Sequence, residues 1–472
     1  MSNGESKIRK LKSSNTYINA SFIYVLANGI GQGTTLLANF FFTRFMSQAD
    51  YGLYSNYYSY VAILGPIVGA NLYVGLTNAY MDYGEDIHKF RSSLLLLSFV
   101  WGSLVSCVIF GIKAIIGMPM PWIGVILALL HAYSFFAVNY YIYSMNMENR
   151  FMRKGIFLCV PNILQVFSAA IAVVICNNYI SRAAGSTIGV AICGVAAILV
   201  ICKEDRPQYN ADYWQYALRI SLPAIISSVS AMIMQQCDKV MITELFNSET
   251  TAVYALIYNI GYILYAIQQA TSGVWQVWYY NTLEGKKYAN VPEVQKWYMY
   301  IMFILVTGLY MVAPEVIKLL SPSNYWHFEY VIPFVIGSYL IFMYSLHTLT
   351  VQYNKRMGVV SLVISLAAMI NVILNYILIP RFGGLAAAYT SVVSYLFIFV
   401  ASGIYLVSKK QYYFKGRYFG IFGLGTVMMG VIFFFVKEMI LVRYIMFTVL
   451  LLLEAIYAYL KKDQLKTMLG SN

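Results

Sequence analysis

Two adjacent charged residues, Asp238 and Lys239, lie inside a long apolar segment of this chain. If the segment is helical, Asp238 lies eight residues, or roughly 12 Å, from Phe246 at its end. Neighbouring residues of a helix point about 100° apart, so the two charges cannot simply face one another and each needs another partner. Because a charge that faces lipid costs about 2.5–3.5 kcal/mol, both should face a bundle interior or a wet cavity.

A third charged residue, Arg44, allows two interpretations of this pair. In the first, Arg44 forms a structural ion pair with Asp238. In the second, Arg44 and Lys239 form a cationic lining for a diphosphate, where arginine binds phosphate oxygens bidentately and lysine acts as a point charge. The sequence leaves both interpretations open.

Amide side chains form a second polar pattern. Asn28, Gln32, Thr35 and Asn39 follow one another at helical spacing, which places them on one face of the segment 17–43. We interpret this face as lining a polar cavity, where amides can bond to sugar hydroxyls. For any single amide elsewhere we favour a hydrogen bond between helices. The further polar residues are Asn56, Asn71 and Asn78; Ser227, Ser228, Ser230, Gln235 and Gln236; and Asn259, Gln268, Gln269 and Gln276.

Other chemistry has little support in the sequence. His131 and His347 stand alone in apolar segments, and we interpret them as packing residues. The six cysteines lack the paired spacing of metal ligands, so we expect neither a disulfide framework nor a zinc site. No phosphate-binding glycine loop followed by Lys-Ser or Lys-Thr occurs, which argues against ATP hydrolysis. We expect no cofactor, no metal and no enzymatic activity.

Composition places the elements that carry these residues in a membrane. The chain has 472 residues, of which 60% are hydrophobic and 11% charged, whereas soluble domains have roughly 25% charged residues. Its apolar runs are continuous, unlike the alternating strands of a membrane barrel, so we predict an all-α polytopic membrane protein. About 14 transmembrane helices are expected, at 17–43, 53–80, 93–115, 122–144, 156–177, 183–202, 216–246, 252–280, 297–320, 331–353, 358–380, 384–408, 418–436 and 441–460.

The distribution of basic residues predicts the orientation. Of the 32 lysines and arginines, 24 lie at the N-terminus, in every second loop or in the C-terminal tail, whereas Arg182 is among the few in the alternate loops. The positive-inside rule makes the basic side cytoplasmic, so both termini should be cytoplasmic in the inner (cytoplasmic) cell membrane. The net charge of +13 then reflects orientation and attraction to anionic lipids, and we expect no nucleic-acid partner.

An internal repeat indicates two similar bundles. Residues 43–70 are echoed without a gap at 243–270, and the echo pairs Thr43 with Thr243, Tyr54 with Tyr254 and Tyr58 with Tyr258. Such repeats are typical of secondary transporters, whose substrate site lies between the halves. We predict an N-terminal lobe over 1–208 (helices 1–6), a C-terminal lobe over 209–410 (helices 7–12), and helices 13–14 with a cytoplasmic tail over 411–472.

Three blocks resemble a known family. The stretch Thr43–Tyr54 resembles the first outer loop of the polysaccharide transporter family, the O-antigen and capsule flippases of the multidrug/oligosaccharidyl-lipid/polysaccharide exporter superfamily. Asp238–Ile242, followed by Val253 and Tyr254, is similar to that family's helix seven, and Asn375–Thr390 to its helix 11–12 signature. The resemblance implies two six-helix lobes around a hydrophilic cavity, two extra helices, and alternating access that turns over a polyprenyl-diphosphate-linked oligosaccharide.

Parts of these blocks have architectural explanations. Pro380 should end helix eleven, and Gly383 and Gly384 should permit the reversal into helix twelve. Likewise we interpret Gly52 and the pair Tyr54 and Tyr254 as shaping the outer turns.

We therefore predict a lipid-linked oligosaccharide flippase with membrane lipids as further partners, and leave open whether sodium or protons are coupled. One alternative is a cation-coupled exporter of small amphipathic molecules, with Asp238 as the coupling carboxylate. Another is a membrane-embedded polysaccharide polymerase or acyltransferase, which the short outer loops and lone histidines disfavour. The candidate substrate-binding residues are Arg44, Lys239, Asp238, Asn28, Gln32, Asn39, Asn56, Gln235, Asn259 and, at the cavity mouth, Arg381.

Overall fold

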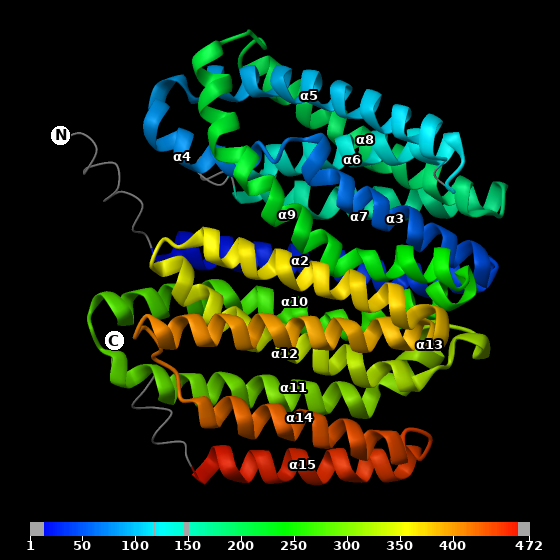
Figure 1. Ribbon diagram of the computed structural model, residues 1–472, viewed down its shortest axis with the longest axis vertical. Coiled ribbons are helices and arrows are strands. Elements are labelled where there is room, and N and C mark those ends of the chain that lie inside the picture. Colours follow the sequence, from blue (N-terminus) through cyan, green and yellow to red (C-terminus); the bar gives the residue numbers. More distant parts are fainter. Residues whose placement is uncertain (1–13, 118, 146–150, 461–472) are drawn as a thin grey trace. The chain divides into compact units, whose positions relative to one another are not determined.

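The computed structural model describes residues 14–117, 119–145 and 151–460, and within these ranges the chain is helical and contains no strand. Figure 1 follows the helices in order. They are α2 (Ser14–Phe45), α3 (Gln48–Val68), α4 (Tyr73–Tyr83), α5 (Ile87–Ile116), α6 (Trp122–Ser144), α7 (Phe151–Ile175), α8 (Tyr179–Glu204), α9 (Ala211–Leu245), α10 (Ser248–Glu284), α11 (Val291–Leu320), α12 (Val331–Tyr353), α13 (Met357–Ser408), α14 (Gly416–Val436) and α15 (Ile440–Leu460).

These helices confirm the predicted all-α membrane fold. Among the described residues, ten helices are long and apolar enough to cross a membrane by length and composition. One of them, α13, covers two predicted runs. Gly383 adopts φ 65° and ψ −153°, and this kink, three residues after Pro380, divides α13 between the two runs. With α13 divided there, and with α3 and α4 taken together, the helices occupy the predicted segments.

The prediction of one continuous helix over 53–80 is wrong. The chain leaves the helix after Val68, and Ala70 and Asn71 adopt φ values of 48° and 51°, which side-chain-bearing residues rarely take. Pro66 lacks an amide hydrogen and weakens the helix just before the break. The repeat ends here structurally, because α10 continues unbroken through Ala270.

The chain forms two compact units. Unit 1 contains Met1–Ala255, Leu320–Pro322 and Ser361–Ala387, and unit 2 contains Leu256–Leu319, Ser323–Val360 and Ala388–Asn472. Unit 1 therefore joins α9 and the first half of α13 to the N-terminal helices. The lobe boundaries at 208 and 410 stay a prediction.

Small residues bring helices close together in unit 1. Gly185 and Gly189 lie four residues apart on α8, and a Cβ at either position would overlap backbone of Ser168 or Leu164 on α7. This is the small-xxx-small pattern of membrane helix pairs, which gain stability from close backbone packing where water supplies no driving force.

A buried ion pair anchors the last helix of unit 2. Arg443 of α15 is 1% exposed and binds Glu315 of α11 with both terminal nitrogens, one of them 2.7 Å from Glu315 Oε2. Arg443 also donates to the backbone oxygen of Met311. The pair fixes α15 against α11 in a region where an isolated charge would be costly.

Candidate functional site

The buried carboxylate of Asp238 is the centre of a polar cluster in unit 1. Asp238 is 2% exposed, and it accepts hydrogen bonds from the Tyr254 hydroxyl of α10 and from Asn375 Nδ2 of α13, the latter at 2.7 Å. Asn375 donates its second amide hydrogen to Asn371 Oδ1 at 3.1 Å. Hydrogen bonds to a charged acceptor offset the cost of burying this carboxylate.

Lys239 points to different neighbours. Its ammonium donates to Gln236 Oε1 at 3.0 Å, and the Ser59 hydroxyl of α3 donates to the same oxygen at 3.3 Å. Lys239 is 6% exposed. The carboxylate of Asp238 is thus bonded by α10 and α13, and the ammonium of Lys239 by an amide that also bonds to α3.

Local sequence explains why these side chains converge. The residues Asn371 and Asn375 lie one turn apart on α13, so both amides share one face. The first turn of α10 is fixed by Asn247, whose side chain accepts from the Thr250 amide at 2.7 Å. Tyr254 follows one turn later and reaches back to α9.

The repeat gives the two equivalent tyrosines different electrostatic surroundings. Tyr254 donates to a carboxylate, whereas the Tyr54 hydroxyl shares a 2.8 Å hydrogen bond with Ser186. The Tyr54 ring lies 3.7 Å from the guanidinium of Arg182, which also lies 3.7 Å from the Phe42 ring and 5.0 Å from the Tyr51 ring. Arg182, predicted above in an outer loop, is therefore a buried cation held by aromatic rings.

The remaining predicted residues take different positions. Asn39 is buried and accepts from the Tyr51 hydroxyl at 2.8 Å, and Asn56 is buried on α3. Arg44 is exposed, donates to the Phe40 carbonyl at 3.1 Å and lies over the Phe40 ring.

Of the others, Arg381 is exposed, and Gln235 and Asn259 are half-buried. The side chains of Asn28, Gln32 and Asn78 lie outside the described residues. The structure therefore brings Asp238 and Lys239 into one cluster, buries Asn39 and Asn56 in the same unit, and leaves Arg44 and Arg381 exposed.

Sequence reasoning missed three members of the cluster. Tyr254 was assigned to the outer turn, Asn375 only opened the third family block, and Asn371 was not singled out. Two amides one turn apart in an apolar segment were the signal that could have identified the α13 face.

The two histidines are hydrogen-bonded within their packing. His131 Nδ1 lies 3.2 Å from the Tyr57 hydroxyl and 3.4 Å from that of Thr187. His347 Nδ1 lies 3.1 Å from the backbone oxygen of Phe399, and the His347 ring stacks on the Phe399 ring. His131 thus has hydroxyl partners that its isolation in the sequence did not predict.

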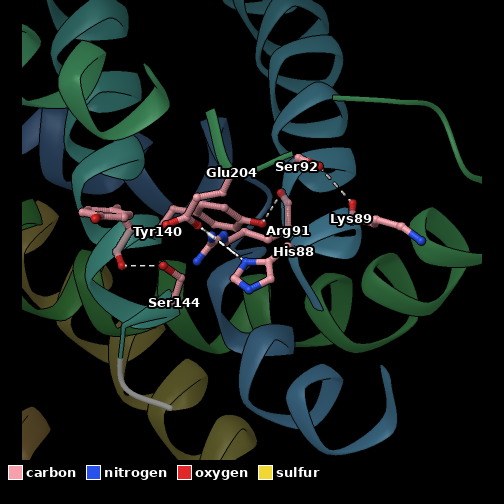
Figure 2. Close-up of polar contacts among 8 residues, drawn as sticks. His88, Lys89, Arg91, Ser92, Tyr140, Ser144 and Glu204 are labelled. Atoms are coloured by element: carbon pink, nitrogen blue, oxygen red, sulfur yellow. Dashed lines mark hydrogen bonds and ion pairs between the residues drawn. The ribbon is translucent and has the colours of Figure 1, made fainter. Parts of the chain in front are cut away.

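A second polar cluster fastens α5, α6 and α8 together (Figure 2). Arg91 of α5 is 2% exposed and forms an ion pair with Glu204 at the end of α8, and His88 Nδ1 lies 3.5 Å from the same carboxylate. The Tyr140 hydroxyl of α6 donates to the backbone oxygen of Arg91 at 2.9 Å. This contact braces the end of the bundle that the charge distribution predicts to be cytoplasmic.

Within the described residues, no group of three or more His, Cys, Asp or Glu side chains could hold a metal ion. The polar cluster around Asp238 is instead a hydrogen-bonding site that contains one carboxylate and one ammonium.

The fold is that of known membrane transporters. The structure of the lipid II flippase MurJ in its inward closed conformation matches with a TM-score of 0.72 at 14% identity, covering 95% of this chain and 100% of that one. An inward-facing multidrug resistance MATE transporter of the MOP superfamily matches with a TM-score of 0.56 at 13% identity, covering 82% of this chain and 99% of that one. The Vibrio cholerae MATE transporter VcmN in its bent form matches with a TM-score of 0.52 at 12% identity, covering 85% and 98%.

The family is shown by sequence. A model of the family described as polysaccharide biosynthesis protein matches residues 18–279, which is more than half of the chain, and this protein belongs to that family. Among curated proteins, none matches the sequence.

Proposed function

We propose that this protein is a flippase that moves a polyprenyl-diphosphate-linked oligosaccharide from the cytoplasmic to the outer leaflet by alternating access, without acting as an enzyme. The observation that carries the proposal is the buried cluster of Asp238 and Lys239 on α9. A carboxylate and an ammonium inside a membrane helix are costly and are usually retained for function. The family and the MurJ-like fold support a lipid-linked saccharide as the substrate.

In this proposal Lys239 and Arg44 bind the diphosphate by charge-assisted hydrogen bonds. Asp238 accepts hydrogen bonds from two neutral donors, Tyr254 and Asn375. These bonds stabilise the buried carboxylate, so it does not need a cation as its only partner. The amides Asn28, Gln32, Asn39, Asn56, Gln235 and Asn259 bind sugar hydroxyls, and Arg381 meets the substrate at the cavity mouth.

The test replaces the two cations. Lys239→Gln and Arg44→Gln should accumulate in the membrane normally, yet fail to flip the lipid-linked oligosaccharide in proteoliposomes. Arg44→Lys should keep part of the activity, because it retains charge and loses the bidentate fork. Lys318→Gln is the matched control, since Lys318 is an exposed cation at the end of α11.

Two outcomes would contradict the assignment of these residues. Full flipping by the Arg44→Gln, Lys239→Gln double variant at normal abundance would exclude both cations from substrate binding. Loss of protein that Asp238→Asn restores would show instead that the cations only neutralise Asp238.

The second candidate function is cation-coupled export of small amphipathic molecules. It is favoured by the oxygen-rich surroundings of Asp238, where Asn371 and Tyr254 lie beside the carboxylate. Moving one charge through 100 mV is worth about 2.3 kcal/mol, so coupled transport should respond to membrane potential. Flipping that stays constant while potential, sodium and proton gradients are each collapsed would exclude coupling. Export of small amphipaths without flipping would favour this candidate.

A membrane-embedded polymerase or acyltransferase generally needs a large outer loop or a catalytic histidine with a polar partner. His131→Ala and His347→Ala should therefore leave flipping nearly unchanged if the proposal holds.

A further inference from the structure

A polar and aromatic stripe runs along α10 in unit 2. Its residues follow one another at alternating spacings of four and three, so they share one helical face. At 1.5 Å per residue the stripe extends about 27 Å, close to the roughly 30 Å thickness of a hydrocarbon core. This tyrosine stripe consists of Tyr258, Tyr262, Tyr265, Gln269, Ser272 and Gln276.

The rings of the stripe form a continuous surface. Those of Tyr258 and Tyr262 are stacked with centroids 5.5 Å apart, and those of Tyr262 and Tyr265 are 4.5 Å apart. Phe334 of α12 supports Tyr258 from the side at 5.6 Å, edge to face. Gln269 donates its amide to the Tyr265 hydroxyl. Stacking and hydrogen bonding therefore hold the rings in place before any ligand binds.

The stripe is partly exposed at a depth in the membrane where side chains that face lipid are normally apolar. The three tyrosines are half-buried, Gln269 is exposed, and Tyr265 falls at the middle of the predicted span 252–280. Tyrosines that face lipid gather at the membrane interfaces, and an amide that faces hydrocarbon lacks hydrogen-bond partners. In contrast, Val274 of the same helix is 77% exposed and suits lipid. We infer that the stripe faces an aqueous cavity.

The repeat shows that the fold does not require these rings. Within the helical part of the first copy, which ends at Val68, the equivalent positions 200 residues earlier are Tyr58, Ala62 and Gly65. Small residues are thus compatible with this place in the fold, and the tyrosines at 262 and 265 are specific to one copy. A role in binding explains that asymmetry better than packing does.

We propose that the tyrosine stripe is the binding track for the saccharide part of the lipid-linked substrate. A sugar ring has apolar C–H faces that can pack on aromatic rings, and hydroxyls that amides and phenols can bond. The stripe supplies both groups along one face and carries no charge that would attract the diphosphate. This inference rests on the proposed function and adds that α10 selects for the saccharide.

The experiment separates the sugar from its anchor. Binding to the purified full-length protein is measured for a polyprenyl-diphosphate-linked oligosaccharide and for the same polyprenyl diphosphate without sugar. The Tyr262→Ala, Tyr265→Ala variant should bind the oligosaccharide about tenfold more weakly, a loss of about 1.4 kcal/mol, and the bare diphosphate with unchanged affinity. Tyr262→Phe should retain most of the affinity because it keeps the ring.

The matched control is Tyr288→Ala. Tyr288 lies outside the stripe, in the short 3₁₀ turn η2 (Tyr288–Asn290), and its ring stacks on Tyr413 with centroids 4.6 Å apart. The Tyr288→Ala substitution also removes a stacked tyrosine, and it should change neither the affinity for the oligosaccharide nor the affinity for the bare diphosphate. If the alanine variant does not fold, Tyr262→Leu with Tyr265→Leu retains apolar bulk without a ring and serves the same comparison.

The outcomes are distinguishable. If the Tyr262→Ala, Tyr265→Ala variant loses affinity equally for both ligands, or loses none for either, the tyrosine stripe is not a saccharide track, and the proposed function stays intact. Wild-type protein that binds neither ligand would overturn the proposed function together with the inference. A loss of affinity for the oligosaccharide alone supports the tyrosine stripe as the binding track for the saccharide.

Discussion

A buried carboxylate needs donors, and Asp238 receives them from two helices that are distant in sequence. Tyr254 and Asn375 both bond to it. Hydrogen bonds to a charged group contribute about 1.5–3 kcal/mol each, against about 0.5–1.5 kcal/mol for neutral pairs. The repeat supplies a natural comparison, since Tyr54 occupies the equivalent position and bonds to the neutral Ser186.

We expect Tyr254→Phe to destabilise the protein by about 1.5–3 kcal/mol, because the carboxylate loses a donor. The matched variant Tyr54→Phe should cost about 0.5–1.5 kcal/mol, since it removes a neutral hydrogen bond and keeps the ring beside Arg182. Thermal unfolding of the two purified variants in the same detergent measures the difference. Equal shifts would show that Asp238 does not depend on the Tyr254 hydroxyl.

At the scale of elements, the two turns of the repeat that the charge distribution predicts to be outer meet in unit 1. The start of α3 packs so closely on the start of α10 that a Cβ at Gly52 would overlap the backbone oxygen of Ser248. Gln48 also donates to the backbone oxygen of Glu249 at 3.3 Å. The repeat position of Gly52 is Ala252, so only one side of this contact requires glycine.

Gly52→Ala should therefore disturb this contact and cost about 1–3 kcal/mol, as overpacking does in a closely packed interior. Gly65→Ala is the control on the same helix, because a Cβ there meets no atom within 4 Å. It should be neutral or slightly stabilising. Unfolding temperature and flipping rate measured for both variants test the prediction, and a Gly52→Ala protein as stable and active as the control would refute it.

At the scale of the whole molecule, the chain is a multi-pass membrane protein whose orientation is predicted from charge. With the predicted spans, 24 of the 32 lysines and arginines fall on one side of the membrane. Membrane insertion retains such basic loops in the cytoplasm, so orientation is a property of the entire sequence.

Reporter fusions after Lys12 and after Lys466 should both indicate the cytoplasm. The stretch Ser47–Tyr51, which contains the N-cap and the first turn of α3, should be labelled by a membrane-impermeant reagent from outside. An external C-terminus would mean an odd number of spans and would contradict the equivalence of the two predicted lobes.

Much of this architecture was predictable from the sequence because it is local. Continuous apolar runs determine where helices cross a membrane, and the kink at Gly383 follows from Pro380 and the glycine itself. The placement of Asp238 and Lys239 inside a helix follows from the apolar run around them, and helical geometry predicts that adjacent side chains point in different directions.

Only the tertiary structure decided which groups meet. Asn375 lies 137 residues from Asp238 along the chain, and no local pattern specifies that contact. Arg182 was predicted at a loop and is buried among rings from α2 and α3, and the helix over 53–80 breaks after Val68. In each case the outcome depends on residues from other helices, because packing partners and unpaired polar groups are determined by the assembled bundle and not by the local run.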